Sequence, residues 1–268
     1  MELHSVLGRT GRLVFRLGLS GSYHPGEATL HAGLDAGMNY VLWYWWQKDM
    51  ARVLREVFPA RREQIILATG VGNLGNWAVR RGVEACLRRL QTDYIDIFQI
   101  FWVGAGGLKP QTLDLLRRYQ EDGKIRHIAI STHARRYAAE LVRQGVLDVV
   151  MMRYNAAHRG AEEDLFPHLP ASNPGVVSYT ATCWKELLQR PRGWPQDGPR
   201  PAAGDCYRFV LSNPNVDVCL TAPASRRELE ENLAAVTRGP LDPDEMAFMR
   251  GFGDAVYRGP WRWLWAGA

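Results

Sequence analysis

Three side chains of this sequence are suited to exchange a proton with a small molecule: the phenol of Tyr44 and the imidazoles of His24 and His133. General acid–base catalysis uses such groups when their surroundings tune their pKa values. The charges nearest to Tyr44 along the chain, Lys48 and Asp49, are expected to open a helix, so nothing visible lowers the pKa of its phenol. His24 also suits a loop, and His133 a helix cap. These three residues are the catalytic candidates, with the structural interpretations left open.

Aromatic side chains are concentrated in the segment Met38–Gln47 and recur after other apolar runs. Aromatic faces bind flat or cationic molecules by stacking and cation–π contacts. We therefore predict an aromatic pocket for a small-molecule ligand. Its candidate substrate-binding residues are Tyr23, Trp43, Trp46, Phe101, Trp102, Tyr154 and Asn155. The alternative is that the tryptophans only plug the end of the core.

The composition is that of a globular protein, with 46% hydrophobic and 23% charged residues. The net charge of +5 comes from arginines in scattered pairs such as Arg80/Arg81, which is typical of solvated helix surfaces and argues against a nucleic-acid partner. No apolar run is long enough for a membrane span, and we expect a cytoplasmic protein. The cysteines lack metal-ligand or C-x-x-C spacing, which predicts reduced thiols and no metal site. They are Cys86, Cys183, Cys206 and Cys219. Nothing indicates an oligomeric state.

The candidate residues follow short apolar runs that alternate with longer helical patterns. The runs are continuous in Val, Ile and Leu, as in parallel strands buried on both faces. They are Arg16–Ser20, Asn39–Trp43, Ile65–Thr69, Ile95–Phe101, His127–Ser131, Val146–Met151, Gly175–Tyr179 and Val216–Leu220. The helical segments are Glu27–Ala36, Lys48–Val57, Trp77–Leu90, Pro110–Glu121, Arg135–Gln144, Ala161–Leu169, Gly204–Ser212 and Arg226–Val236. Eight such units in series predict an α/β fold, a (β/α)8 TIM barrel whose strand ends gather the candidates at one rim.

We expect residues 1–268 to form a single barrel domain with two additions. One is a proline-rich loop at about 188–203, which suits a lid over the rim or a disordered loop equally well. The other is a C-terminal helix and Trp-rich tail at about 242–268. The start of this helix at Asp242 combines an acidic cap with a proline in the first turn.

Several motifs in order give the chain its resemblance to a known family. They are Leu7–Gly11 with Arg16–Leu19, Leu34–Tyr40, Leu87–Asp96, Gly123–Ser131, Tyr154–Asn155 and Leu229–Leu233. In these segments the sequence resembles the aldo/keto reductase superfamily over nearly its full length, and Leu87–Asp96 is a highly specific match. The resemblance implies the same (β/α)8 barrel.

The resemblance also implies a catalytic tetrad that this sequence lacks. In the family a tyrosine donates a proton to the carbonyl, a lysine lowers its pKa, an aspartate pairs with the lysine and a histidine orients the substrate. The matching positions are occupied by Gln47, Gly70, Leu42 and Phe101. The sequence is thus similar to a divergent member in which standard carbonyl reduction is not expected.

The cofactor side of the resemblance is kept in part and implies NADP(H) as the candidate cofactor. Tyr179 matches the tyrosine that stacks on nicotinamide, and Ser131 with Thr132 matches a Ser-Asn pair that holds the carboxamide. Met151 replaces a glutamine, and Glu228 stands where some members have a basic residue. The residues matching the adenosine end are Ser225, Arg226, Glu231 and Asn232.

Two functional hypotheses remain. One is a divergent oxidoreductase-family enzyme that still binds a nicotinamide cofactor, uses a non-standard acid or performs other chemistry in the aromatic pocket. The other is a catalytically dead scaffold that binds a ligand or a protein partner. Barrels of this type host many chemistries, so the fold alone does not decide between them.

Overall fold

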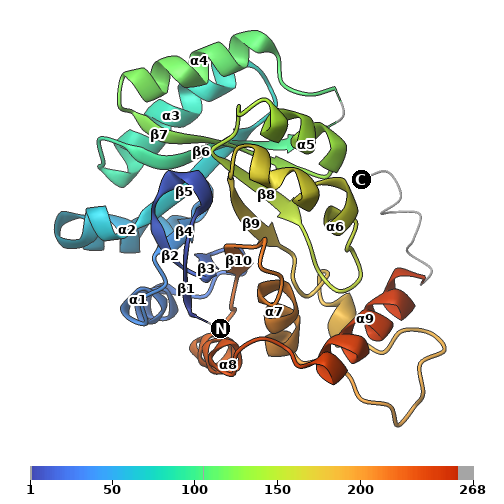
Figure 1. The fold of residues 1–268 in the computed structure, drawn as a ribbon. Coiled ribbons are helices and arrows are strands. Elements are labelled where there is room, and N and C mark those ends of the chain that lie inside the picture. The colour runs from blue at the N-terminus through green and yellow to red at the C-terminus, as the bar shows by residue number, and fades with distance from the viewer. Residues whose placement is uncertain (1, 105, 259–268) are drawn as a thin grey trace.

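The computed structural model describes residues 2–104 and 106–258, and at its centre lies a closed barrel of eight parallel strands (Figure 1). Neighbours in the barrel are neighbours along the chain, and the last strand pairs with the first, Cys219 lying beside Leu17. The strands are β3 (Leu17–Ser20), β4 (Tyr40–Leu42), β5 (Ile66–Gly72), β6 (Ile95–Val103), β7 (Ile125–Thr132), β8 (Val149–Arg153), β9 (Gly175–Tyr179) and β10 (Val218–Thr221). The predicted (β/α)8 barrel is confirmed.

Helices follow the strands and surround the barrel (Figure 1). They are α1 (Glu27–Asp35), α2 (Lys48–Arg61), α3 (Asn76–Leu90), α4 (Pro110–Glu121), α5 (Arg135–Arg143), α6 (Ala161–Asp164), α7 (Ala203–Leu211), α8 (Arg226–Thr237) and α9 (Pro243–Tyr257). The prediction of one helix over Ala161–Leu169 was wrong, because α6 ends at Asp164 and a 3-10 helix covers Phe166–Ala171. Pro167 and Pro170 lack the N–H groups that would continue an α-helix.

Burial divides the apolar side chains into an interior and an outer core. The interior core fills the barrel with side chains such as Leu42, Ala68 and Met151. The outer core lies between the strands and the helices and includes Trp43 and Met152. Successive residues of a strand point to opposite faces, which explains why Leu42 and Trp43 belong to different cores.

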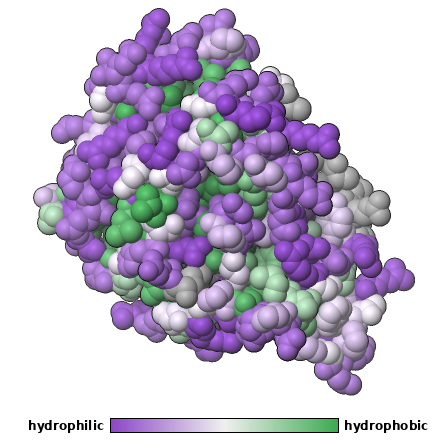
Figure 2. All heavy atoms as spheres, viewed as in Figure 1, coloured by the Kyte–Doolittle hydropathy of each residue, from purple (hydrophilic) through white to green (hydrophobic). Residues whose placement is uncertain are grey.

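A short hairpin precedes the barrel and covers its N-terminal end. Its strands β1 (His4–Val6) and β2 (Leu13–Phe15) pair antiparallel, and Leu7 between them is fully buried in the interior core. The face in Figure 2 is mostly hydrophilic, with hydrophobic side chains in small separate groups. Because the hairpin covers the N-terminal end of the barrel, the strand ends that carry the predicted site lie at the opposite, C-terminal end.

The proline-rich loop packs against the last helix. The Trp194 ring lies edge-on to Phe252 of α9, with ring centroids 4.8 Å apart, and edge-on to Phe248, with centroids 6.3 Å apart. Its indole N–H donates to the main-chain oxygen of Pro199 at 3.1 Å. α9 begins at the expected acidic cap, where Asp242 and Glu245 form a reciprocal capping box. No helix in the described ranges is long and apolar enough to cross a membrane. The Trp-rich part of the predicted tail, residues 259–268, lies outside the described residues.

Candidate functional site

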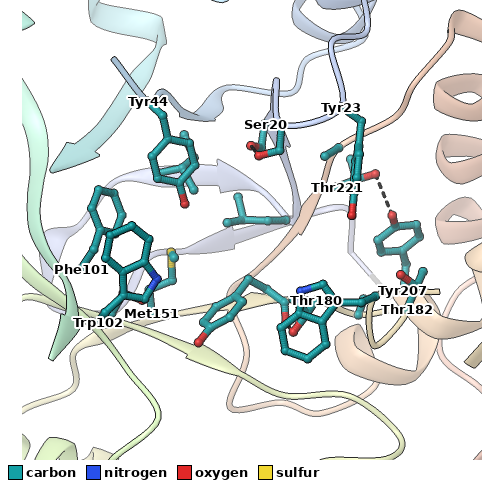
Figure 3. Close-up of a pocket in the computed structure, with 18 of the residues that line it drawn as sticks. Ser20, Tyr23, Tyr44, Phe101, Trp102, Met151, Thr180, Thr182, Tyr207 and Thr221 are labelled. Carbon is teal, nitrogen blue, oxygen red and sulfur yellow. Dashed lines mark hydrogen bonds between the residues drawn. The ribbon is translucent and has the colours of Figure 1, made fainter. Parts of the chain in front are cut away.

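A cavity of about 330 Å³ opens at the C-terminal end of the barrel, and we call it the mouth cavity. Its described lining holds aromatic rings, hydroxyl groups and apolar side chains, and no Asp, Glu, Lys or Arg. The lining residues are Ser20, Ser22, Tyr23, Leu42, Tyr44, Phe101, Trp102, Ser131, His133, Met151, Tyr179, Thr180, Ala181, Thr182, Trp184, Tyr207, Leu220, Thr221 and Ala222. Figure 3 shows Tyr44, Phe101 and Trp102 on one side and Thr182, Tyr207 and Thr221 on the other.

Tyr179 and His133 form the main polar pair in the mouth cavity. The Tyr179 hydroxyl lies 3.2 Å from Nε2 of His133, and the rings meet edge-on. Burial, assisted by the charges of Arg153 and Arg135, lowers the pKa of His133 to about 4. Burial also raises the pKa of Tyr179 above its usual value, although Arg153 and Ser131 oppose this change. Both groups are therefore neutral at neutral pH, and neither is tuned to transfer a proton there.

Tyr44 is the third aromatic group of the site with acid–base chemistry. Its ring stacks on Trp46 with centroids 4.6 Å apart and a tilt of 10°, and Phe101 lies at 5.0 Å on a tilted plane. Burial raises the pKa of Tyr44 to about 12. A phenol with a raised pKa is a weaker acid, which is the opposite of what a proton donor for carbonyl reduction requires.

The four positions that the resemblance assigns to the catalytic tetrad make structural contacts. Leu42 and Phe101 are buried and line the mouth cavity. Gln47 is buried, and its Oε1 accepts the Tyr44 N–H at 3.0 Å. At Gly70 a β-carbon would lie 1.9 Å from the main-chain oxygen of Gln99, so no side chain fits this backbone.

The structure brings together only part of the set predicted from the sequence. Seven of these residues line the mouth cavity: Tyr23, Tyr44, Phe101, Trp102, Ser131, His133 and Tyr179. His24 is exposed with a φ of 53° and borders a separate depression next to Gln47, so it lies apart from the other catalytic candidates. Trp46 is exposed and contributes through its stack on Tyr44.

Four other candidates point away from the mouth cavity, and their predicted placement was wrong. Trp43 is buried in the outer core, where its indole N–H donates to the Gln47 main-chain oxygen at 3.1 Å. Tyr154 is also in the outer core, and its hydroxyl donates to Glu162 at 2.7 Å.

Asn155 is fully buried and shapes its own loop, because its Nδ2 donates to the Thr180 main-chain oxygen at 2.8 Å. The Thr132 hydroxyl donates to the Val103 main-chain oxygen and accepts the Ala134 N–H. It is thus committed to main-chain groups and does not face a ligand.

Other residues of the mouth cavity were not among the candidates. They are Ser20, Ser22, Leu42, Met151, Thr180, Ala181, Thr182, Trp184, Tyr207, Leu220, Thr221 and Ala222. Tyr207 lies on α7, and its hydroxyl accepts from the Thr221 hydroxyl at 2.9 Å (Figure 3). A helix that follows a barrel strand starts at the same rim, so the early position of Tyr207 in its helix was the available signal.

The start of α8 carries the residues that the resemblance assigns to the adenosine end of the cofactor. Ser225 caps the helix by accepting the Glu228 N–H at 3.2 Å. The Glu228 carboxylate in turn accepts the Ala224 N–H at 2.8 Å. Asn232 is buried and donates to the Thr221 hydroxyl at 3.2 Å, which links α8 to the lining of the mouth cavity.

The first turns of α8 carry two arginines and three glutamates. Arg226 pairs with Glu230 and Arg227 with Glu231, each at 2.8 Å and one turn apart. Glu228 adds a third carboxylate. A helix N-terminus favours an anion, but here acidic side chains already supply it. The arginines can still turn to a phosphate, because exposed pairs of this kind contribute little to stability.

The chain is similar to a known protein family and to solved structures of the same fold. The family model described as the aldo/keto reductase family matches residues 28–183, which is more than half of the chain. An aldo-keto reductase of Bacillus halodurans, AKR11C1 in its holo form, superposes with a TM-score of 0.77 at 24% identity over 95% of this chain and 97% of that one. An aldo/keto reductase of Klebsiella pneumoniae in complex with NADP and acetate has a TM-score of 0.76 at 22% identity over 95% and 96%.

Two sequence relatives show the same relationship. L-galactose dehydrogenase of Arabidopsis thaliana is 27% identical over 59% of this chain and 58% of its own length. The aldo-keto reductase YhdN of Bacillus subtilis is 25% identical over 58% of this chain and 51% of its own length. The chain thus spans little more than half of these relatives. The match of the family model over more than half of the sequence, on a closed (β/α)8 barrel, shows that the chain belongs to the aldo/keto reductase family.

Proposed function

We propose that the mouth cavity binds the nicotinamide end of NADH or NADPH, and that the chain is a divergent oxidoreductase without the family's proton donor. The observation that carries this proposal is the wall formed by the Tyr179 ring and the Ser131 hydroxyl, which continues to Thr221 and Ala222 before α8. A flat ring can stack on Tyr179 while a ribose lies along the hydroxyl-lined side. A protein of the same fold from Klebsiella pneumoniae was solved in complex with NADP, which supports a nicotinamide nucleotide as the ligand to test.

The groups around the cavity fit the nicotinamide end better than the phosphate end. Tyr179 and Ser131 line the cavity, whereas Met151 offers no amide to the carboxamide and Thr132 is committed to main-chain groups. Along α8 the three glutamates outnumber the two arginines. We therefore expect no strong preference for the 2′-phosphate of NADPH over NADH.

A bound nicotinamide would supply or accept a hydride. The residues of the mouth cavity would hold the ring, exclude water and keep a flat acceptor between Tyr44, Phe101 and Trp102. Because Tyr44, Tyr179 and His133 are neutral and poorly tuned as acids, acceptors that need a proton in the transition state are disfavoured. Flat acceptors such as quinone-like carbonyls are favoured, because their reduced form is stable as an anion until water protonates it.

The proposal is tested by titrating the protein with NADH and NADPH while its tryptophan emission is recorded. Trp102 and Trp184 line the mouth cavity, so a bound nicotinamide should quench their fluorescence or accept excitation energy from them. Tyr179→Leu should weaken binding by about two- to twelvefold, because an aromatic contact is worth about 0.5–1.5 kcal/mol beyond area burial. Trp77→Leu, outside this cavity, is the control and should bind like the wild type.

Two results would count against this function. Absence of any signal with either nucleotide at millimolar concentration would remove the redox proposal. Rapid NADPH-dependent reduction of simple aldehydes would contradict the loss of the proton donor, which is worth about 10²–10⁴-fold in rate.

The second candidate function is a catalytically inactive barrel that binds a ligand or protein partner. It is favoured by the structural use of Gln47 and Gly70, two of the four positions that the resemblance assigns to the tetrad. Under this alternative the mouth cavity binds a neutral aromatic molecule, and neither nucleotide competes with it. The same titrations, repeated with such a molecule present, separate the two candidates.

A further inference from the structure

A second cavity, of about 390 Å³, lies beside the mouth cavity between α3 and the loop that follows β4. We call it the Trp/Arg groove. Its lining residues are Trp43, Tyr44, Trp45, Trp46, Thr69, Gly70, Val71, Gly72, Leu74, Trp77, Ala78, Arg81, Gly82, Ala85, Cys86, Arg89, Phe101 and Trp102. It shares only Tyr44, Phe101 and Trp102 with the mouth cavity, so these three rings form a wall between the two.

The Trp/Arg groove is lined by many aromatic side chains, which can stack on a flat ring. Its rim carries the large exposed side chains Trp45, Trp77 and Trp102, which are 65%, 63% and 64% exposed. Gly82 and Ala85 lie on the face of α3 that lines the groove, and Gly82 packs closely against Val71, because an added β-carbon would lie 2.3 Å from the Val71 Cγ1. Several exposed tryptophans around one hollow are unusual, and an apolar concentration of this kind marks a site of interaction.

The loop that carries Trp45 and Trp46 is held in place in the absence of a ligand. The Arg89 side chain donates to the Trp45 main-chain oxygen at 2.9 Å. Gln47 accepts from the Tyr44 N–H and, through its main-chain oxygen, from the Trp43 indole. A wall that is already ordered loses little conformational entropy when a ligand binds, which favours affinity.

Charge identifies the kind of ligand. The described lining contains the guanidinium groups of Arg81 and Arg89 and no carboxylate. Arg89 already gives one N–H to the loop, whereas Arg81 is exposed and forms no ion pair within the described parts of the chain. A guanidinium beside an aromatic slot matches a carboxylate, which it can bind through two parallel hydrogen bonds.

We propose that the Trp/Arg groove binds a flat aromatic carboxylate, with its ring between the tryptophans and its carboxylate on Arg81. The site is separate from the nucleotide proposed for the mouth cavity, so either proposal can fail alone. Tyr44, Phe101 and Trp102 are left out of the test because they belong to both cavities.

The test measures the affinity of 2-naphthoate and of its neutral counterpart 2-naphthylmethanol for the full chain by calorimetry. The wild type should bind the acid about tenfold more tightly than the alcohol, as expected for one charge-assisted contact at a partly exposed site. Arg81→Gln should weaken the acid about tenfold and leave the alcohol unchanged. Arg80→Gln, an exposed neighbour on α3 outside the lining, is the matched control and should bind both as the wild type does.

A second pair of variants locates the ring. Trp77→Leu should weaken both probes several-fold, and Tyr23→Leu in the mouth cavity should weaken neither. Failure of 2-naphthoate to bind, equal affinity for acid and alcohol, or equal effects of Arg80→Gln and Arg81→Gln would overturn the proposal. So would loss of binding in Tyr23→Leu, which would move the probe to the mouth cavity.

Discussion

Replacing Gly70 by alanine should destabilise the barrel, although the change adds a single methyl group. The new β-carbon would lie 1.9 Å from the Gln99 main-chain oxygen, whereas carbon–oxygen contacts normally begin near about 3.3 Å. No side-chain rotation relieves this overlap, so β5 must move from β6, with which Ala68–Gly72 is in register. Overpacking costs about 1–3 kcal/mol, and movement of main chain places this case near the upper end. For a chain of this size that lowers the melting temperature by about 6–12 °C.

The assay is thermal and urea unfolding followed by circular dichroism, with Gly251→Ala as the matched control. Gly251 lies in α9, is exposed, and has nothing within 4 Å of the position of a β-carbon. Alanine there should stabilise the protein by about 0.5–1 kcal/mol, because it is the better helix former. A Gly70→Ala protein that melts with the wild type would refute the steric reasoning. Gly70→Lys, which carries the same β-carbon, should be no more stable than Gly70→Ala.

Three further expectations concern pH and the loop after β4. Ligand affinity of the mouth cavity should be constant from about pH 6 to 9, because the pKa of His133 is about 4 and that of Tyr44 about 12; a bell-shaped binding profile would contradict this. Arg208 lowers the pKa of Glu245 to about 2. The ionised Glu245 therefore contributes to stability above the unfolded pKa of about 4.3, and this contribution is lost as the pH falls through the folded pKa. Glu245→Gln should therefore unfold at lower urea than the wild type at neutral pH, with the gap closing in acid; equal midpoints at neutral pH would show that the ion pair does not matter. Gln47→Leu should cost about 1 kcal/mol by removing the Tyr44 contact and should shift tryptophan emission, and an unchanged spectrum would argue against its role in the loop.

The barrel was predictable because its signal is carried by many residues at once. Runs such as Ile95–Phe101 are mainly apolar on both faces, because a strand of this parallel sheet is buried on both sides. The helix over Ala161–Leu169 was misjudged because its apolar pattern continues while Pro167 removes a donor within it. There the covalent structure of one residue outweighs the periodicity of its neighbours.

The site was predictable by strand end but not by side-chain direction. Alternation along β4 sends Leu42 inward and Trp43 outward, so treating every residue after the strand as part of the rim was wrong for Trp43. The same alternation separates Met151, in the interior core, from Tyr154 in the outer core. For His24 no such rule exists, because the direction of a loop residue depends on contacts that neither spacing nor composition specifies.

The contacts of Gln47 limit which substitutions this sequence can accept. Because its side chain holds the loop through Tyr44, and its main-chain oxygen holds Trp43, returning the family's tyrosine there would remove part of that support before a lysine existed to make the tyrosine an acid. The lysine in turn meets main chain at Gly70. Introducing the family's tyrosine and lysine one at a time is therefore expected to cost stability at both positions. A variant built to carry them would have to redesign the loop after β4 and the β5–β6 pairing at the same time.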